Sequence, residues 1–91
     1  MPRTLYVTGD PYDRALVARL VALLRERSCR SVRAATLALE DEGIEYDGVH
    51  EAEIYVDSDT WIAWLTDREA AALRASLHPF PVHPVLPDPV P

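Results

Sequence analysis

The apolar positions near the amino terminus predict a strand followed by an amphipathic helix. Leu5–Thr8 is a short β-branched and aromatic run, which is typical of a strand. Beyond it, Asp10 is expected to cap a helix that has Pro11 in its first turn and ends near Ser28. Six apolar residues recur in that segment with a period close to 3.6 and form one stripe: Leu16, Val17, Leu20, Val21, Leu23 and Leu24.

A second helix is predicted over Val32–Glu42. Ser31 precedes it in the position of an N-cap. Gly43 follows where a left-handed residue ends a helix, and Ile44 supplies the hydrophobic contact that accompanies such an end. These boundary signals favour a helix over a strand for this alanine-rich segment.

Two further strands are predicted, at Glu53–Asp57 and Thr60–Leu65, joined as a hairpin through residues 58–59. The alternative is one long helix capped near Asp59. The hairpin is favoured because Thr66–Glu69 has the spacing of a capping box, which would begin a new helix there. That last helix should stop before Pro79.

These elements predict one small α+β domain over residues 1–78, in the order strand, helix, helix, β-hairpin, helix. Residues 79–91 hold six of the eight prolines and are expected to form a proline-rich tail, either free or strapped across the domain. With 91 residues, the chain is of single-domain size.

Charge is distributed very unevenly along the chain, whose net charge is −6. Residues 1–39 contain seven arginines and three acids, whereas residues 40–59 contain nine acids and no lysine or arginine. The simplest interpretation is a solvated surface that the protein's own arginines partly neutralise. The functional interpretation is a surface that attracts a basic partner. The residues predicted to bind that partner are Glu40, Asp41, Glu42, Glu45, Asp47, Glu51 and Glu53.

The composition argues against most catalytic chemistry. The chain has no lysine for a Schiff base or a phosphate loop, and Cys29 is its only cysteine, which excludes an internal disulfide and a cysteine-rich zinc site. Its longest apolar run is too short for a membrane span or a signal-peptide core. We therefore expect a cytoplasmic protein that is not an enzyme and uses no metal or cofactor.

One short motif has the pattern of a phosphotransferase. Asp57-Ser-Asp59-Thr60 follows an apolar strand and resembles the first motif of haloacid-dehalogenase-type enzymes, in which the first aspartate is the nucleophile and the second a general acid/base. Only 32 residues follow Asp59, and the distal acids and basic residue of that family have no counterpart. A turn rich in Asp and Ser is the favoured interpretation.

The second predicted helix also resembles a DNA-recognition helix. Residues 31–44 are similar to the recognition helix of GntR-type winged-helix regulators, and residues 44–56 fit the wing loosely. The matching positions are Val32, Arg33, Ala35, Leu39, Glu40, Glu42, Gly43 and Ile44. The resemblance implies that Arg33, with Arg30 beside it, would contact nucleic acid. The acidic residues of the wing segment oppose DNA phosphates, which makes nucleic acid the less favoured partner.

Together these features predict a non-catalytic, acidic protein-binding module that acts as an inhibitor, adaptor or assembly factor. Its expected partner is a basic protein surface or a nucleic-acid-binding protein, and a second copy of the chain is a further candidate because its basic and acidic segments are complementary. No membrane contact is expected. The alternative is a winged-helix-like DNA-binding transcriptional regulator.

Overall fold

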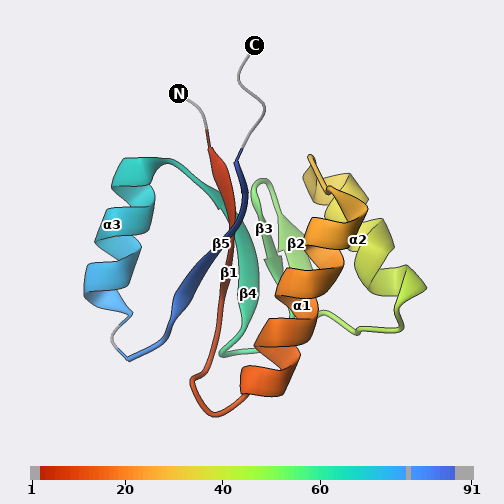
Figure 1. Cartoon of the computed structure of the whole chain (residues 1–91), viewed down its shortest axis with the longest axis horizontal. Helices are drawn as coiled ribbons and strands as arrows, with labels where there is room; N and C mark the ends of the chain where they lie inside the picture. The colour runs from red at the N-terminus through yellow and green to blue at the C-terminus, as the bar shows by residue number, and fades with distance from the viewer. Residues whose placement is uncertain (1–2, 78, 88–91) are drawn as a thin grey trace.

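The computed structural model describes residues 3–77 and 79–87. Within them the chain forms three helices and a five-stranded antiparallel sheet, which confirms the predicted α+β class. The elements, in chain order, are β1 (Thr4–Thr8), α1 (Arg14–Arg27), α2 (Val32–Asp41), β2 (Gly48–His50), β3 (Glu53–Tyr55), β4 (Trp61–Leu65), α3 (Asp67–Ser76) and β5 (Val82–Pro87). The strand order is β2-β3-β4-β1-β5. Helices α1 and α2 lie on one face of the sheet and α3 lies on the other (Figure 1).

The larger core lies between the sheet and the α1–α2 layer. In β1, Leu5 and Val7 are fully buried on this side, whereas Tyr6 belongs to the smaller core under α3. The amphipathic stripe predicted for the first helix is confirmed, because its residues Val17, Leu20, Leu23 and Leu24 are buried. Each fully buried leucine contributes about 1.5–3 kcal/mol relative to an exposed one, so this stripe fixes α1 on the sheet.

The start of α1 differs from the prediction. Asp10 is not its N-cap; the helix begins at Arg14, with Asp13 in the N-cap position. The Asp10 carboxylate instead accepts a hydrogen bond from the Tyr12 amide (2.8 Å), and the Asp13 amide donates to the Asp10 carbonyl (3.0 Å). The Asp10 side chain therefore stabilises a local turn around Pro11. Aspartate favours such turns next to proline, and here the turn forms in place of the helix N-cap.

The boundaries of α2 match the prediction. The Ser31 hydroxyl accepts a hydrogen bond from the Ala34 amide (3.0 Å), which is the expected N-cap. Gly43 has a φ of +70°, and the amide of buried Ile44 donates to the Leu39 carbonyl (2.9 Å). The left-handed Gly43 and the buried Ile44 after it therefore end the helix, as the sequence predicted.

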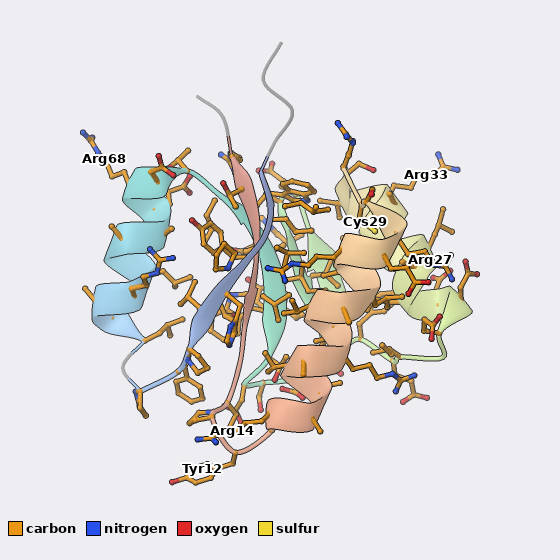
Figure 2. The ribbon with its side chains drawn as sticks, in the orientation of Figure 1. Tyr12, Arg14, Arg27, Cys29, Arg33 and Arg68 are labelled. Atoms are coloured by element: carbon orange, nitrogen blue, oxygen red, sulfur yellow. The ribbon has the colours of Figure 1, made fainter. Side chains whose placement is uncertain are left out.

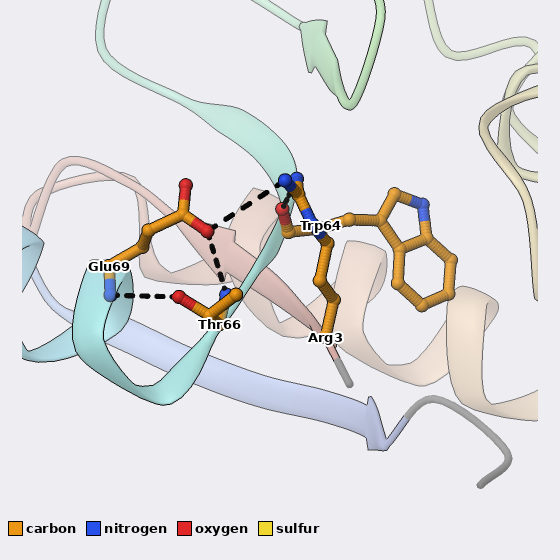
Figure 3. Close-up of polar contacts among 4 residues, drawn as sticks. All are labelled: Arg3, Trp64, Thr66 and Glu69. Carbon is orange, nitrogen blue, oxygen red and sulfur yellow. Dashed lines mark hydrogen bonds and ion pairs between the residues drawn. The ribbon is translucent and has the colours of Figure 1, made fainter. Parts of the chain in front are cut away.

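The predicted hairpin and the helix after it are also confirmed. Strands β3 and β4 pair antiparallel, with Tyr55 opposite Trp61. Thr66 and Glu69 form the reciprocal capping box of α3, and Arg3 links this cap to β4: its guanidinium donates to the Trp64 carbonyl (3.0 Å) and lies 3.9 Å from the Glu69 carboxylate (Figure 3).

Two strands had no counterpart in the prediction. Residues 48–50 form β2, which pairs with β3 at one edge of the sheet. Residues 82–87, assigned above to the proline-rich tail, form β5 at the other edge, paired with β1; residues 88–91 lie outside the described residues. An edge strand accepts proline because one side of it needs no ladder hydrogen bonds. Arg25 of α1 donates to the carbonyls of Pro84 (3.1 Å) and Val85 (3.4 Å), beside the register shift in this pair.

Candidate protein-binding site

The acidic residues at the end of α2 contact other groups of the same chain. Arg27 of α1 lies 3.2 Å from the Asp41 carboxylate and 3.6 Å from that of Glu42. The carboxylate of Glu40 accepts a hydrogen bond from the Tyr46 hydroxyl (2.7 Å), and this bond, more than burial, raises the pKa of Tyr46. Arg27 of the first helix therefore offsets the charge of Asp41 and Glu42, whereas the partner of Glu40 is a neutral hydroxyl, which offsets no charge.

Two other predicted partner-binding residues lie apart from this group. Glu45 is exposed in the loop after α2. Glu51 lies in the turn between β2 and β3, where it lines a shallow hollow that Arg3 and Arg30 also line. Positive charge therefore accompanies Glu51 as well, so the acidic segment does not form one continuous surface.

The remaining acids converge on a groove at the β2–β3 end of the sheet. Asp47 and Glu53, both predicted partner-binding residues, line a cavity of about 380 Å³ together with Asp57. Its other lining residues are Tyr55, Ser58, Trp61 and Leu73. Among the described residues that line this groove there is no lysine, arginine or histidine. Hereafter we call this site the acidic groove.

Strand alternation explains which side chains reach the acidic groove. In β3, Ile54 is buried in the larger core, so its neighbours Glu53 and Tyr55 project toward the opposite, α3 face. Helix α3 packs on β4 and β5 and leaves β3 at its flank. Leu73 of α3 and Trp61 of β4 then form an apolar boundary to the three carboxylates.

Local hydrogen bonds hold the side chains of Glu53 and Asp57 and the backbone of Asp47 in place. The Tyr55 hydroxyl donates to the Glu53 carboxylate, and this bond, then burial and the negative charge, raises the pKa of Tyr55. The Asp57 carboxylate accepts from the Asp59 amide (2.8 Å), and the Asp47 amide donates to the Tyr55 carbonyl (2.7 Å). Tyr55 keeps 39% of its surface exposed, so an aromatic face lies beside these charges.

The residues considered above for phosphotransfer, thiol or metal chemistry lie outside the acidic groove or already make hydrogen bonds within the chain. The Asp57–Asp59 segment is an aspartate turn between β3 and β4, as the hydrogen bond from the Asp59 amide indicates. Cys29 is buried, and burial raises the pKa of its thiol despite the nearby Arg27 charge. Within residues 3–77 and 79–87, no three His, Cys, Asp or Glu side chains are arranged to hold a metal ion.

The residues proposed for nucleic acid lie at the start of α2. Arg30 and Arg33 are both exposed there, and Figure 2 shows Arg33 projecting away from the sheet. The segment that fits a wing contains the β2–β3 hairpin, which carries Glu51 in its turn. Positive and negative side chains therefore alternate on this part of the surface.

The binding residues predicted from the sequence include only two of the seven described residues that line the acidic groove, Asp47 and Glu53. Asp57 was assigned to a turn, and Tyr55 and Leu73 were not singled out as binding residues. The register of the hairpin is the signal that could have found these residues. Tyr55 lies opposite Trp61, and the alternation along β3 places Glu53 on the same face of the sheet as both. The contribution of Leu73 depends on how α3 crosses the sheet, which no local pattern specifies.

No helix among the described residues is both long and apolar enough to cross a lipid bilayer. In comparisons with protein-family models, with curated proteins and with solved structures, nothing matches this chain.

Proposed function

We propose that this protein is a non-catalytic protein-binding module that receives a basic segment of a partner in the acidic groove. The observation that carries the proposal is the convergence of Asp47, Glu53 and Asp57 on one groove whose described lining residues include no lysine, arginine or histidine. Such a module acts as an inhibitor, an adaptor or an assembly factor.

The groove suits arginine better than any other side chain. Carboxylates accept paired hydrogen bonds from a guanidinium, and the faces of Tyr55 and Trp61 offer cation–π contacts. Arginine is also less strongly hydrated than lysine, so it loses less on entering a groove bounded by Trp61 and Leu73. A basic protein surface, including that of a nucleic-acid-binding protein, supplies such side chains, whereas DNA phosphates would be repelled.

A short arginine-rich peptide tests the proposal without a known partner. Its affinity is measured by fluorescence anisotropy for the wild type and for the triple variant Asp47→Asn, Glu53→Gln, Asp57→Asn. Exposed charge pairs contribute about 0.2–1 kcal/mol each, so we expect the triple variant to bind roughly tenfold more weakly.

The matched control removes the same charges elsewhere: Asp13→Asn, Glu26→Gln and Asp67→Asn, at three exposed positions. Its affinity should stay within about twofold of wild type, since surface charges beyond a Debye length are screened. Equal weakening by the two triple variants would show that only net charge matters and would refute the groove as the site. Tight binding of random-sequence duplex DNA that depends on Arg30 and Arg33 would favour the DNA-binding alternative instead.

A further inference from the structure

A cavity larger than the acidic groove lies on the other side of the sheet, between α1 and the chain leading into β5. Its volume is about 700 Å³. Ala18, Val21 and Ala22 of α1 form one wall, and Pro79 and Pro81 form part of the opposite wall. Neither the acidic groove nor the proposed function involves any of these residues.

The cavity exists because the flank of α1 that faces β5 carries small side chains. Ala18 and Ala22 are one helical turn apart and both are exposed, whereas Leu20 and Leu24 fill the core on the adjoining face. Arg25 bridges from α1 to the carbonyls of Pro84 and Val85, which closes the far end of the cavity. A helix flank lined by short apolar residues and closed by a bridge leaves a hollow suited to an apolar molecule.

The cationic side chains at its rim outnumber the acids. Among its described lining residues, two arginines, Arg14 and Arg25, accompany a single acid, Asp10. The carboxylate of Asp10 already accepts a hydrogen bond from the Tyr12 amide. Asp10 is close in sequence to Arg14, near the start of α1, and offsets its charge there; Arg25 lies about 16 Å further along the helix.

Of the two arginines, Arg25 is the better preorganised to bind an anion. Two of its five N–H donors hold it to the backbone of β5, next to His83, and the other donors are left for a ligand. A guanidinium that is already immobilised loses little conformational entropy when it binds an anion.

We propose that this cavity binds a small amphiphile with an apolar body and a single carboxylate, whose carboxylate contacts Arg25 and whose body lies against Ala18 and Ala22. A volume of about 700 Å³ is that of a small-molecule site, and the lining is mostly apolar with few polar groups, as such sites require. The positive rim selects an anion over a neutral or cationic amphiphile of the same length.

The test is a titration of the isotope-labelled protein, followed by backbone amide NMR shifts, with decanoate and decyltrimethylammonium below their micelle concentrations and with 1-decanol below its solubility limit. Decanoate should shift the amides of Ala18, Val21, Ala22 and His83 in a saturable way. We expect 1-decanol to bind about tenfold more weakly, because charge-assisted hydrogen bonds are lost, and the ammonium compound weaker still. Equal affinity for decanoate and 1-decanol would overturn the assignment of an anionic ligand.

Four variants locate the site. Ala22→Trp fills the cavity and should abolish the shifts, and Ala18→Leu, a smaller intrusion, should weaken them. Ala15→Trp is the control, because Ala15 is exposed on the same helix and does not line the cavity. Arg25→Gln should weaken decanoate about tenfold more than it weakens 1-decanol, because only the carboxylate loses charge-assisted hydrogen bonds; equal weakening of the two would overturn Arg25 as the contact.

Decanoate binding that survives Ala22→Trp, or shifts that do not cluster at these amides, would overturn the cavity as the site. Shifts of the same amides that grow with protein concentration in the absence of any amphiphile would identify a second copy of the chain as the occupant and would also overturn the proposal.

Discussion

Replacing Gly9 with alanine should disturb the contact between β1 and α1. A Cβ at this position would lie 2.5 Å from a methyl carbon of Val17 and 3.4 Å from the Thr60 hydroxyl. Val17 is 5% exposed, and a β-branched side chain in a helix has one strongly preferred rotamer. Because the methyl group cannot turn away, the loop or the helix has to move.

The size of the effect follows from this overlap. Overpacking of a filled core costs about 1–3 kcal/mol. For a domain of this size each kcal/mol lowers Tm by roughly 4–8 °C, so Gly9→Ala should unfold at least several degrees below wild type. Val17→Ala alone costs about 2 kcal/mol, since two methyl groups are lost and a small cavity remains.

The double variant Gly9→Ala, Val17→Ala tests whether steric overlap with Val17, and no other cause, makes Gly9→Ala destabilising. The new methyl group at residue 9 then occupies space that Val17 has vacated, so the double variant should be more stable than the sum of the two single effects by about 1–2 kcal/mol. The free energy of unfolding is measured by urea denaturation with circular dichroism. Gly48→Ala is the control because nothing lies within 4 Å of its added Cβ, and its effect should stay within about 0.5 kcal/mol. Strict additivity, or equal effects of Gly9→Ala and Gly48→Ala, would refute the reasoning.

Three further predictions concern polar groups. The buried Thr60 hydroxyl has no hydrogen-bond partner among the described residues, so Thr60→Val should be neutral or stabilising in urea unfolding, whereas Thr8→Val loses a bond to a backbone carbonyl and should cost about 1 kcal/mol. The hydrogen bond from the Thr66 amide, then that from its hydroxyl, lowers the pKa of Glu69. Wild type should therefore exceed Glu69→Gln in stability at pH 7, and this difference should disappear as pH falls through the lowered pKa; a difference that persists in acid contradicts it. Arg27→Gln should cost less than about 1 kcal/mol, because its ion pairs are exposed, and the loss should shrink in 0.5 M salt; a larger, salt-independent loss contradicts this.

Elements with local signals could be predicted from the sequence. Ser31, Gly43 and the Thr66–Glu69 box specify helix ends within a few residues of themselves, and each has the expected geometry. The predicted start of α1 was wrong because an aspartate such as Asp10 can either cap a helix or close a turn. The residues around Asp10 are compatible with both conformations.

Strands β2 and β5 could not be predicted because they depend on partners elsewhere in the chain. Gly48–His50 has little strand propensity and is held by its pairing with β3. Val82–Pro87 carries two prolines and pairs with β1, almost eighty residues earlier in the chain, in a position that only an edge strand can take. The division of the acidic segment depends in the same way on Arg27, which the packing of α1 against α2 brings to Asp41.

The acidic groove follows from the incomplete cover of one sheet face. Strands lie about 4.8 Å apart and a helix is about 10 Å wide, so α3, which packs on β4 and β5, leaves the β2–β3 end open. Charged side chains on this uncovered face are solvated and discourage apolar association, a protection that accounts for Glu53 and Asp57. Protection alone does not account for Trp61 and Leu73, which keep apolar surface at the same groove.

The two kinds of side chain should therefore act on different steps of binding. Charges on the rim of an interface steer the encounter, whereas buried aromatic contacts set how long the complex lasts. In stopped-flow or surface-binding kinetics with a basic peptide, added salt and the change Asp57→Asn should mainly slow association. Trp61→Ala should mainly speed dissociation, by roughly tenfold if the ring is an anchor. If Trp61→Ala changes only the association rate, the ring does not contact the bound peptide, and the groove acts by charge alone.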